Sequence, residues 1–329
     1  MTDETHAASL ARLGWSAFFG DQVGDDEAGL LPVRVTEVHR GRISGLSLHG
    51  PVDLVLPPKS PTGDYAVGDF VLAEPGDFLV RRLLARRSLL TRRTGDGATQ
   101  LSGANIDTLF IVTSCNADFD VSRLSRYLAM AVQSEIPAVL VLTKADTAGD
   151  AAPYIAQAAT LSQDLPVIVI DPRRPETRAA LGPWFGPGRT VALTGSSGVG
   201  KSTLVNTLTG PGSAKPQATG AVRAHDSTGR HTTTARSLHA VAGGGWVLDS
   251  PGIRTVHLGE MTEGLDMVFT DITDLAGDCK FSNCGHLREP GCAVRAAVET
   301  GTIDPERFAR WRKLQDENAA AATPRRGRR

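Results

Sequence analysis

The sequence predicts an α/β fold in three parts, and three patterns along its 329 residues support this prediction. Several short strands follow one another closely between about residues 31 and 90. After about residue 105, continuous apolar runs alternate with helix-length segments. A segment containing three of the four cysteines begins after about residue 260 and is followed by a helical pattern. A chain of this length is expected to form two or three domains.

Composition restricts the class of protein. Apolar residues make up 41% of the chain and charged residues 22%, as in folded globular proteins. No apolar run approaches the roughly 18 residues of a membrane span, so we expect no membrane partner. Acids precede any base at the N-terminus, which argues against a secretory signal. Four cysteines are too few for a disulfide scaffold, and we therefore expect a reducing, cytoplasmic compartment.

The formal charge of −1 argues at face value against a nucleic-acid partner, but the charges are unevenly distributed. Residues 1–30 contain six acids and one base, whereas residues 81–93 contain six arginines and no acid. The last six residues, PRRGRR, add four arginines. Such blocks are either solvated surfaces and tails or contacts for a polyanion, and the sequence leaves both interpretations open.

The first part of the chain is predicted to be a small barrel. VRVTEVHRGRISGLSLHG alternates apolar and polar residues around a turn at Arg40-Gly41, and PVDLVLP, DFVLAEP and FLVRRLLARRSLL follow. This spacing is typical of a barrel of the OB or SH3 kind. An oligonucleotide-binding barrel is the functional interpretation, and the arginine-rich last strand, FLVRRLLARRSLL, favours it. The fold alone does not establish that function.

The middle of the chain is predicted to be a doubly wound α/β domain. DTLFIVTS, AVLVLTK, LPVIVID and TVALTGS are apolar throughout, as in strands buried on both faces of a parallel sheet. VSRLSRYLAMAVQSE and APYIAQAATLSQD are helix-length segments between them, and DPERFARWRKLQDEN predicts a helix near the C-terminus.

A phosphate-binding loop is the strongest local motif. GSSGVGKS, residues 195–202, matches GxxxxGK[ST] between an apolar strand and a helical segment that ends at Gly210. Its glycines allow backbone N–H groups to surround phosphate oxygens at a helix N-terminus. Lys201 is expected to neutralise the β- and γ-phosphates and Ser202 to bind Mg²⁺. A plain glycine turn is the alternative. The candidate residues are Gly195, Ser196, Ser197, Gly198, Val199, Gly200, Lys201, Ser202 and Thr203.

Two further segments are expected near the γ-phosphate. The apolar strand WVLD ends at Asp249 and continues into a DxxG pattern, in which Asp249 can hold Mg²⁺ through water and the Gly252 N–H can contact phosphate. The aperiodic segment at 211–234 is typical of a switch loop, in which Thr234, or else Thr233, would bind Mg²⁺. An ordinary turn and a merely flexible loop are the alternatives.

A guanine-reading motif is expected at Thr143-Lys144-Ala145-Asp146, after the strand AVLVL. Guanine recognition needs a carboxylate that accepts the ring N1–H and the exocyclic amine, usually within NKxD. Asp146 has the position of that carboxylate, and the stem of Lys144 can pack on the base. Thr143 replaces the asparagine, so we expect weaker guanine affinity. A surface loop is the alternative interpretation.

The order of the motifs is unusual. An ordinary GTPase has its phosphate-binding loop, switch, DxxG and NKxD in that order, whereas here TKAD comes first. A circular permutation preserves the spatial site because domain termini commonly lie close together. The predicted fold is therefore α/β: a circularly permuted P-loop GTPase domain with an N-terminal OB-like β-barrel and a C-terminal zinc-binding helical domain. The expected domains are residues 1–92, 93–258 and 259–329.

The C-terminal part contains the ligand pattern of a zinc site. Cys279, Cys284, His286 and Cys292 form a complete tetrahedral set with no open position, which indicates a structural rather than a catalytic zinc. Clustering of these cysteines is otherwise hard to explain in a reducing compartment. The remaining cysteine, Cys115, ends an apolar strand and is expected to be an ordinary buried thiol.

Together, the permuted order, the zinc pattern and the β-rich N-terminal part resemble the ribosome small-subunit-dependent GTPase A family (RsgA, or YjeQ), over nearly the whole chain. The matching segments are LARLGW, GSSGVGKS, GRHTTT, DSPG and CKFSNCGHLREPGCAV. Two departures concern guanine affinity or selectivity: TKAD replaces NKxD, and DPRR after VIVID replaces the usual Ser-Ala element that contacts the base.

The resemblance implies a factor in late maturation of the small ribosomal subunit. It would bind the subunit and its rRNA, hydrolyse GTP to GDP and phosphate with subunit-stimulated turnover, and then be released. The OB-like and zinc domains would contact rRNA mainly through backbone charge and shape. The expected cofactors are GTP or GDP, Mg²⁺ and one structural Zn²⁺, and the expected state is a cytoplasmic monomer.

The resemblance also points to a catalytic histidine. Ile253 follows DxxG, where a glutamine commonly orients the attacking water, and an isoleucine cannot do so. His231 in GRHTTT is the candidate substitute, and a loop histidine or an RNA contact is the alternative. Two other functions remain open: a nucleotide-gated rRNA-binding module with little intrinsic hydrolysis, and a P-loop ATPase or kinase.

Overall fold

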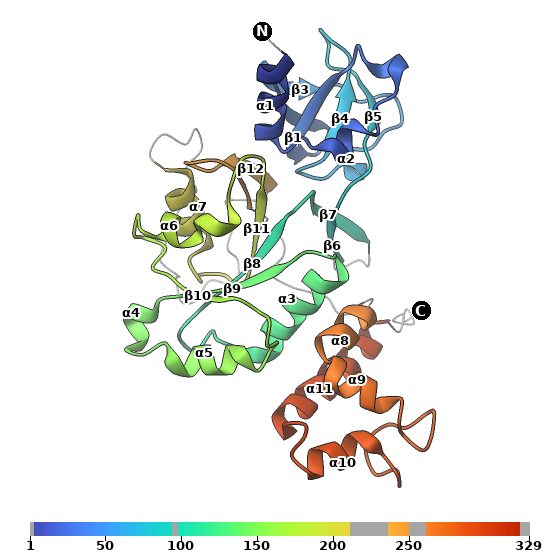
Figure 1. Cartoon of the computed structure of the whole chain (residues 1–329). Coiled ribbons are helices and arrows are strands. Elements are labelled where there is room, and N and C mark those ends of the chain that lie inside the picture. The colour runs from blue at the N-terminus through green and yellow to red at the C-terminus, as the bar shows by residue number, and fades with distance from the viewer. Residues whose placement is uncertain (1–2, 94–97, 211–235, 250–260, 323–329) are drawn as a thin grey trace, which may run out of the picture. The chain divides into compact units, whose positions relative to one another are not determined.

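The computed structural model describes residues 3–93, 98–210, 236–249 and 261–322, whose elements Figure 1 shows. The chain divides into two compact units. The first comprises Met1–Phe119, Ile136–Ala151 and Pro166–Thr255, and the second comprises Asp120–Glu135, Ala152–Leu165 and Val256–Arg329. The second unit thus includes two segments that lie between strands of the first in the sequence. The domain boundaries at 92–93 and 258–259 stay predictions.

The first unit begins with helices and a small barrel. The helices are α1 (Asp3–Leu13), α2 (Ala17–Gly20) and the 3-10 turns η1 (Asp25–Glu27) and η2 (Thr62–Asp64). The strands are β1 (Leu31–His39), β2 (Arg42–Ser47), β3 (Gly50–Leu54), β4 (Phe70–Ala73) and β5 (Val80–Leu83). β1 pairs with β2 and β4, β2 with β3, and β4 with β5, all antiparallel. A parallel bridge between Val55 and Leu79 closes the barrel.

Barrel closure depends on the long first strand. The register of β1 against β2 shifts between Val35 and Glu37, and the N-terminal part of β1 also pairs with β4. A bulge of this kind bends a strand enough to serve two neighbours. The enclosed core includes Val33, Ile43 and Val71, none of which is exposed. This five-stranded closure is that of an OB barrel, and the OB alternative of the sequence prediction is the one that applies.

The arginine-rich segment FLVRRLLARRSLL, residues 78–90, is not a single barrel strand, and that expectation was wrong. β5 belongs to the barrel, whereas β6 (Leu89–Arg93) pairs with β7 (Thr99–Ala104) in a separate two-stranded sheet. Asn105 fixes the change of direction, because its side chain accepts the Arg87 N–H at 2.9 Å and donates to the Gly68 carbonyl at 3.0 Å. The alternation of apolar residues and arginines is compatible with a strand in either sheet, so the sequence pattern could not show that β5 and β6 belong to different sheets.

The α/β part of the first unit contains a mostly parallel sheet (Figure 1). Its strands are β8 (Thr108–Ser114), β9 (Ala138–Thr143), β10 (Val167–Val169), β11 (Thr190–Thr194), β12 (Arg236–Ala240) and β13 (Trp246–Asp249). The order is β10-β9-β8-β11-β13-β12, and only β12 is antiparallel to its neighbour β13. The helices are α4 (Ala145–Ala148), α6 (Thr177–Leu181), η3 (Gly182–Trp184) and α7 (Lys201–Thr209). The carboxyl ends of β9, β10, β11 and β13 therefore lie at one edge.

Barrel and α/β sheet are continuous within the first unit, because β1 also pairs antiparallel with β12. Arg34 is 1% exposed and lies at this junction. It donates to the Leu13 carbonyl at 2.6 Å and to Thr190 Oγ1 at 2.5 Å, and its guanidinium lies 5.4 Å from the Phe70 ring and 5.6 Å from the Trp246 ring. Burial lowers the pKa of Arg34 to about 9. One buried cation thus joins the N-terminal helix, the barrel and the α/β sheet.

The second unit is helical in the residues that the structure describes. Its helices are α3 (Val121–Gln133), α5 (Ala152–Ala159), α8 (Thr262–Val268), α9 (Thr270–Ala276), α10 (Ala293–Glu299) and α11 (Pro305–Ala322). α3 and α8 approach closely at Gly264, where a Cβ would lie 2.3 Å from the Ala129 carbonyl oxygen. Among the described helices of the chain, none is both long enough and apolar enough to cross a membrane.

Candidate functional site

The phosphate-binding motif connects β11 to α7, which is the predicted strand–loop–helix context. Gly195, Gly198 and Gly200 have φ values of 137°, 80° and 101°, in the region that favours glycine. A Cβ on Gly195 would lie 2.1 Å from the Val112 carbonyl oxygen, because the loop passes directly over β8. Val199 is buried in the core of the sheet. The backbone therefore has the shape of a phosphate loop, and its contacts with phosphate stay a prediction.

Lys201 begins α7 and is only 9% exposed. Its Nζ donates to the carbonyl oxygens of Gly195, at 2.8 Å, and Ser196. A buried ammonium needs such acceptors, and these hold the charge against the loop where phosphate is expected. Ser202 and Thr203 follow in the first helical turn and are partly buried, whereas Ser197 is exposed at the loop.

Asp249 ends β13 and is 5% exposed. β13 pairs in parallel with β11, and Asp249 lies opposite Leu193, just before the phosphate loop begins. The acid and the loop therefore share one edge of the sheet, as an acid that holds Mg²⁺ near a phosphate loop requires. The remaining predicted residues of this region lie outside the described residues: His231, Thr233, Thr234 and Gly252.

Thr143 connects the guanine-reading motif to the phosphate loop. It ends β9, is fully buried, and its Oγ1 lies 2.7 Å from the Val199 carbonyl oxygen and 3.1 Å from the Thr113 carbonyl oxygen. The single hydroxyl proton can be donated to either acceptor, so both carbonyls have a partner within reach. Two segments that are far apart in the permuted sequence are thereby joined at the site where β9 and β11 end.

The carboxylate of Asp146, which the sequence predicts to read guanine, already accepts a hydrogen bond from another side chain. Lys144 has a left-handed φ of 57°, and this turn starts the short helix α4, which carries Asp146. The Asp146 side chain is 46% exposed, and its Oδ2 accepts from Nη2 of Arg173 at 2.8 Å. The motif therefore directly follows β9, as the strand AVLVL predicts, and Asp146 lies in the first turn of α4. Its role in reading guanine, and the packing of Lys144 on a base, stay predictions.

Sequence reasoning assigned no role to Arg173. The DPRR segment, residues 171–174, was recognised only as lacking the usual base-contacting element. The available signal was its position, because a strand that runs parallel to β9 ends immediately before it. Loops after neighbouring parallel strands meet at one edge, so a charged residue here was a candidate neighbour of TKAD.

The four predicted zinc ligands come together in the second unit. One ligand atom from each of Cys279, Cys284, His286 and Cys292 lies within 4.8 Å of the others. Cys279 Sγ is 3.9 Å from Cys292 Sγ and 3.6 Å from His286 Nδ1, and His286 Nδ1 is 3.4 Å from Cys292 Sγ. Tetrahedral Zn²⁺ would separate two sulfurs by about 3.8 Å and a sulfur and a nitrogen by about 3.5 Å. The cluster is therefore compatible with zinc bound through Nδ1 of the histidine.

The pKa shifts of the predicted zinc ligands differ in direction. Burial lowers the pKa of His286, which favours the neutral imidazole that a metal needs. Burial alone raises the pKa of Cys279. Hydrogen bonds from backbone N–H groups at the start of α10 and from the neighbouring thiols together lower it by more, so the net pKa is lowered. Burial raises the pKa of Cys284 to about 11. A thiol with such a pKa loses its proton readily only when a cation binds it.

The arginine-rich segment offers less free charge than its composition suggests. Arg86 makes two hydrogen bonds with the buried carboxylate of Asp69, at 2.7 and 2.8 Å. Arg82 Nε donates to Glu27 Oε1 at 2.7 Å. The other pairs are Arg81 with Glu74, Arg87 with Asp107, and Arg92 with Gln100. Much of this positive charge is matched by acids within the unit, so its support for an rRNA-binding strand is weaker than expected.

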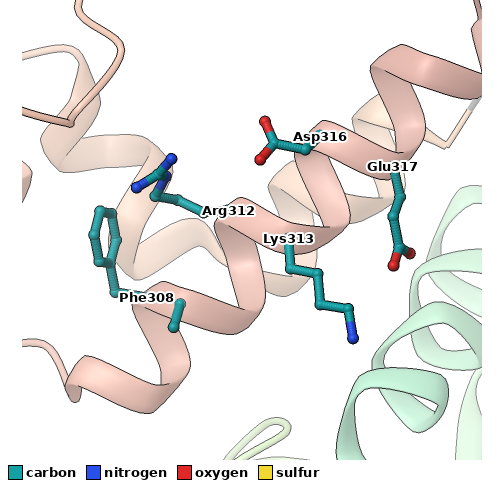
Figure 2. Close-up of a pocket in the computed structure, with 6 residues that line it drawn as sticks. Phe308, Arg312, Lys313, Asp316 and Glu317 are labelled. Atoms are coloured by element: carbon teal, nitrogen blue, oxygen red, sulfur yellow. The ribbon is translucent and has the colours of Figure 1, made fainter.

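A shallow depression of about 430 Å³ lies along α11 in the second unit (Figure 2). Phe308, Arg312, Lys313 and Asp316 line it, together with Ala309 and Glu317. Glu317 is already held by Arg126 of α3. Two bases, Arg312 and Lys313, are followed by two acids one turn further along the helix, and none of the lining residues belongs to the phosphate loop, the TKAD loop or the Cys3His cluster. It therefore gives no second candidate site.

Comparison with known proteins identifies the relatives of this chain. A family model described as RsgA GTPase matches residues 83–259. The small ribosomal subunit biogenesis GTPase RsgA of Mesorhizobium japonicum is 59% identical over 311 residues, which cover 94% of this chain and 90% of that protein. RsgA 2 of Vibrio vulnificus is 42% identical, over 96% of this chain and 89% of its own.

Solved structures support the fold. YjeQ from Thermotoga maritima superimposes with a TM-score of 0.66 at 25% sequence identity. The match covers 91% of this chain and 100% of the YjeQ chain. YloQ, described as a circularly permuted GTPase, gives a TM-score of 0.62 at 23% identity and covers 92% of this chain and 99% of its own. The predicted permuted α/β fold is confirmed.

Proposed function

The chain belongs to the RsgA GTPase family of P-loop GTP hydrolases, and on this premise we propose that it acts in late maturation of the small ribosomal subunit. In this proposal it binds the subunit, hydrolyses GTP to GDP and phosphate with subunit-stimulated turnover, and is released. The names of its relatives support the process, since those proteins are called small ribosomal subunit biogenesis GTPases.

The contact between Thr143 and the phosphate loop is the observation that supports this function best. Its hydroxyl lies 2.7 Å from the carbonyl oxygen of Val199 and so links the base-reading loop to the phosphate loop. A guanine nucleotide spans these two loops, with its base at Asp146 and its phosphates at residues 195–202. The permuted order of the sequence is thus compatible with one continuous nucleotide site.

The described residues suggest a division of roles around the nucleotide. Backbone N–H groups of residues 195–200 surround the phosphates, and Lys201 turns from the loop carbonyls toward the β- and γ-phosphates. Ser202 would hold Mg²⁺ directly and Asp249 would hold it through water, and the ion would supply positive charge that neutralises the phosphates. The second Mg²⁺ hydroxyl is expected from Thr234 or Thr233, the γ-phosphate contact from Gly252, and orientation of the attacking water from His231.

A structural zinc belongs to the same proposal. Cys279, Cys284, His286 and Cys292 would hold Zn²⁺ in a closed tetrahedral set, which has no position for substrate. The metal would organise the segment between α9 and α10, and its chemistry would be structural only. This region and the OB barrel are the candidate rRNA contacts, and we expect a cytoplasmic monomer.

Turnover measured with and without ribosomal subunits tests the proposal. GTP hydrolysis should accelerate in the presence of purified small subunits, and co-sedimentation with them should be stronger with a non-hydrolysable GTP analogue than with GDP. Large subunits serve as the control. Nucleotide-dependent binding without stimulated hydrolysis would instead identify a nucleotide-gated rRNA-binding module.

His231→Ala tests the catalytic assignment separately. The variant should bind GTP normally but lose the stimulation by small subunits, because the attacking water would no longer be oriented. Normal stimulated turnover in His231→Ala would exclude this histidine as the residue that orients water.

A further inference from the structure

The guanidinium of Arg173 occupies the carboxylate that is proposed to read guanine. Nη2 of Arg173 donates to Asp146 Oδ2 at 2.8 Å. We infer that Arg173 sets the affinity for guanine nucleotides by competing with the base for Asp146 and must leave that carboxylate before guanine binds. This inference rests on the proposed role of Asp146, and it extends that role by naming the group that the nucleotide displaces.

The competition follows from matching hydrogen-bond donors. A guanidinium presents parallel N–H donors to a carboxylate, and the N1–H and N2 amine of guanine present a similar pair. Guanine would be a charge-assisted partner of both Asp146 oxygens, and Arg173 already holds one of them, Oδ2. Adenine has an acceptor at N1 and cannot satisfy the carboxylate in this way. Arg173 is therefore a chemical substitute for guanine, and not for adenine, at Asp146.

A second acid, Asp171, also binds the guanidinium of Arg173 and can keep it paired when guanine binds Asp146. Nε of Arg173 donates to Asp171 Oδ1 at 2.8 Å, and Nη2 donates to Asp171 Oδ2 at 2.8 Å. The hydrogen bonds from Arg173 hold the pKa of Asp171 well below its usual range, so this acid stays charged. Loss of the Asp146 bond consequently does not strand the guanidinium, because its two bonds with Asp171 can persist.

The backbone of the DPRR segment is fixed, which makes the competition local. The Pro172 carbonyl oxygen accepts from Thr207 Oγ1 of α7 at 2.5 Å, and the Asp171 carbonyl oxygen accepts from Thr177 Oγ1 at 2.6 Å. The side chain of Arg173 is 63% exposed, whereas Pro172 is buried. Displacement thus requires a change of side-chain rotamer and no rearrangement of the loop.

Solvent exposure limits the size of the effect. Ion pairs between exposed side chains are weak, so Arg173 is expected to reduce guanine nucleotide affinity about two- to five-fold. The reduction should lie in the association rate, because Arg173 stabilises the state in which Asp146 is occupied before the nucleotide arrives. The dissociation rate should change little, since the pair with Asp146 is already broken in the bound state.

Arg174 provides a matched control on the same loop. It is 73% exposed and contacts Asp171, at 3.4 Å, and no contact between Arg174 and Asp146 is found among the described residues. Arg173→Ala and Arg174→Ala each remove one positive charge near the nucleotide. Any general loss of attraction for phosphate is therefore common to both variants, and only Arg173→Ala should free Asp146.

Stopped-flow binding of a fluorescent GDP to the full chain tests the inference. Relative to Arg174→Ala, Arg173→Ala should bind about two- to five-fold faster, with an unchanged dissociation rate and unchanged competition by ADP. The gain should disappear when Arg173→Ala is combined with Asp146→Ala, because no carboxylate is then left to free. Thermal melting of each variant verifies that it is folded.

Two outcomes overturn the inference, and they can be told apart. If Asp146→Ala alone leaves GDP affinity unchanged, the base-reading role fails and the inference fails with it. If Asp146→Ala weakens GDP binding but Arg173→Ala binds no faster than Arg174→Ala, only the competition is refuted. Slower binding or faster release in Arg173→Ala would show instead that Arg173 assists the bound nucleotide.

Discussion

The Cys3His cluster and the guanine-reading loop differ in how the chain assembles them. The four residues of the cluster lie within residues 279–292, and all four ligand atoms come within 4.8 Å of one another. The guanine-reading loop depends instead on three separate segments, around Thr143, Arg173 and Val199. Local spacing nearly determines the first site, whereas the sheet topology determines the second.

The two regions also differ in whether their side chains are already arranged for the proposed ligand, which is Zn²⁺ in one case and guanine in the other. The three distances among Cys279, His286 and Cys292 already fit the edges of a zinc tetrahedron, and the Cys284 ligand atom lies within 4.8 Å of the other three. At the proposed base site, Arg173 donates to Asp146, and under our inference a nucleotide would displace that side chain first. A motif can therefore identify the residues of a site without revealing which of them compete with the ligand.

Removal of one zinc ligand should have the largest effect of the changes considered. Cys292→Ser should reduce zinc content from about one ion per chain to near zero and lower the melting temperature of the second unit substantially. Structural zinc contributes about 10–16 kcal/mol in small zinc domains, and a serine oxygen is a poor replacement for a thiolate. Metal analysis and thermal melting provide the measurements.

Cys115→Ser is the matched control for that experiment, since Cys115 is buried at the end of a strand in the first unit. It should retain zinc while losing some stability of its own, because a hydroxyl replaces a buried thiol. Full zinc content in Cys292→Ser would contradict the proposed ligand set and remove the contrast between the two regions.

A change at Asp146 should give the next largest effect, at the base site. Asp146→Asn should weaken GTP binding at least about 100-fold, because two charge-assisted hydrogen bonds of about 1.5–3 kcal/mol each are altered. Binding of xanthosine triphosphate should improve, since an amide can donate to the xanthine oxygen that replaces the guanine amine. Competition binding with GTP, XTP and ATP measures both changes, and unchanged GTP affinity would favour a P-loop ATPase or kinase.

Much of the fold could be predicted because its patterns are local. Continuous apolar runs predict β8, β9 and β11, which are buried along their lengths, and the glycines of the phosphate loop predict its backbone. Alternation predicts the barrel strands. It does not predict that β6 leaves the barrel, since that depends on the hydrogen bonds of Asn105 with two distant segments.

The functional importance of charge was harder to predict for the same reason. The arginines at 81–93 form a conspicuous cluster in the sequence, but Arg82 pairs with Glu27 and Arg86 with Asp69, both distant along the chain. Composition counts charges and cannot show which are neutralised by long-range partners. Arg173 is the opposite case, because one unremarked arginine lies on the proposed base-reading carboxylate.

A smaller effect is expected when the connection between the base loop and the phosphate loop is cut. Thr143→Val keeps the shape of the side chain but removes the hydroxyl that serves the Val199 and Thr113 carbonyls. The buried carbonyl that accepts the single hydroxyl proton then lacks this donor, so the free energy of unfolding should fall by about 1–3 kcal/mol. Denaturant unfolding and GDP binding provide the measurements, and Thr143→Ser, which retains the hydroxyl, should remain close to the original protein. Equal stability of the two variants would mean that the linkage between the loops is unimportant.

The smallest effect is expected from loss of the ion pair between Arg307 and Asp271, which stabilises helix packing in the second unit and includes no zinc ligand. Arg307 donates to both carboxylate oxygens of Asp271, at 2.7 and 2.8 Å, and its Nη1 donates to the Thr160 carbonyl at 2.9 Å. Burial raises the pKa of Asp271, but the hydrogen bonds and charge of Arg307 lower it by more, so the net pKa lies below its ordinary value of 3.8. This carboxylate therefore stabilises the folded state above about pH 4, and the contribution is lost as the pH falls through the lowered pKa.

Because Asp271 is 45% exposed, its pH-dependent contribution should be below about 1 kcal/mol. Asp271→Asn should abolish that part of the acid dependence below about pH 4 while zinc content at neutral pH stays unchanged, since neither Asp271 nor Arg307 is a ligand in the Cys3His cluster. Urea unfolding at several pH values and metal analysis at pH 7 measure the two properties. Loss of zinc in Asp271→Asn would show that helix packing and metal binding are coupled, and the cluster would then depend on long-range contacts as the base site does.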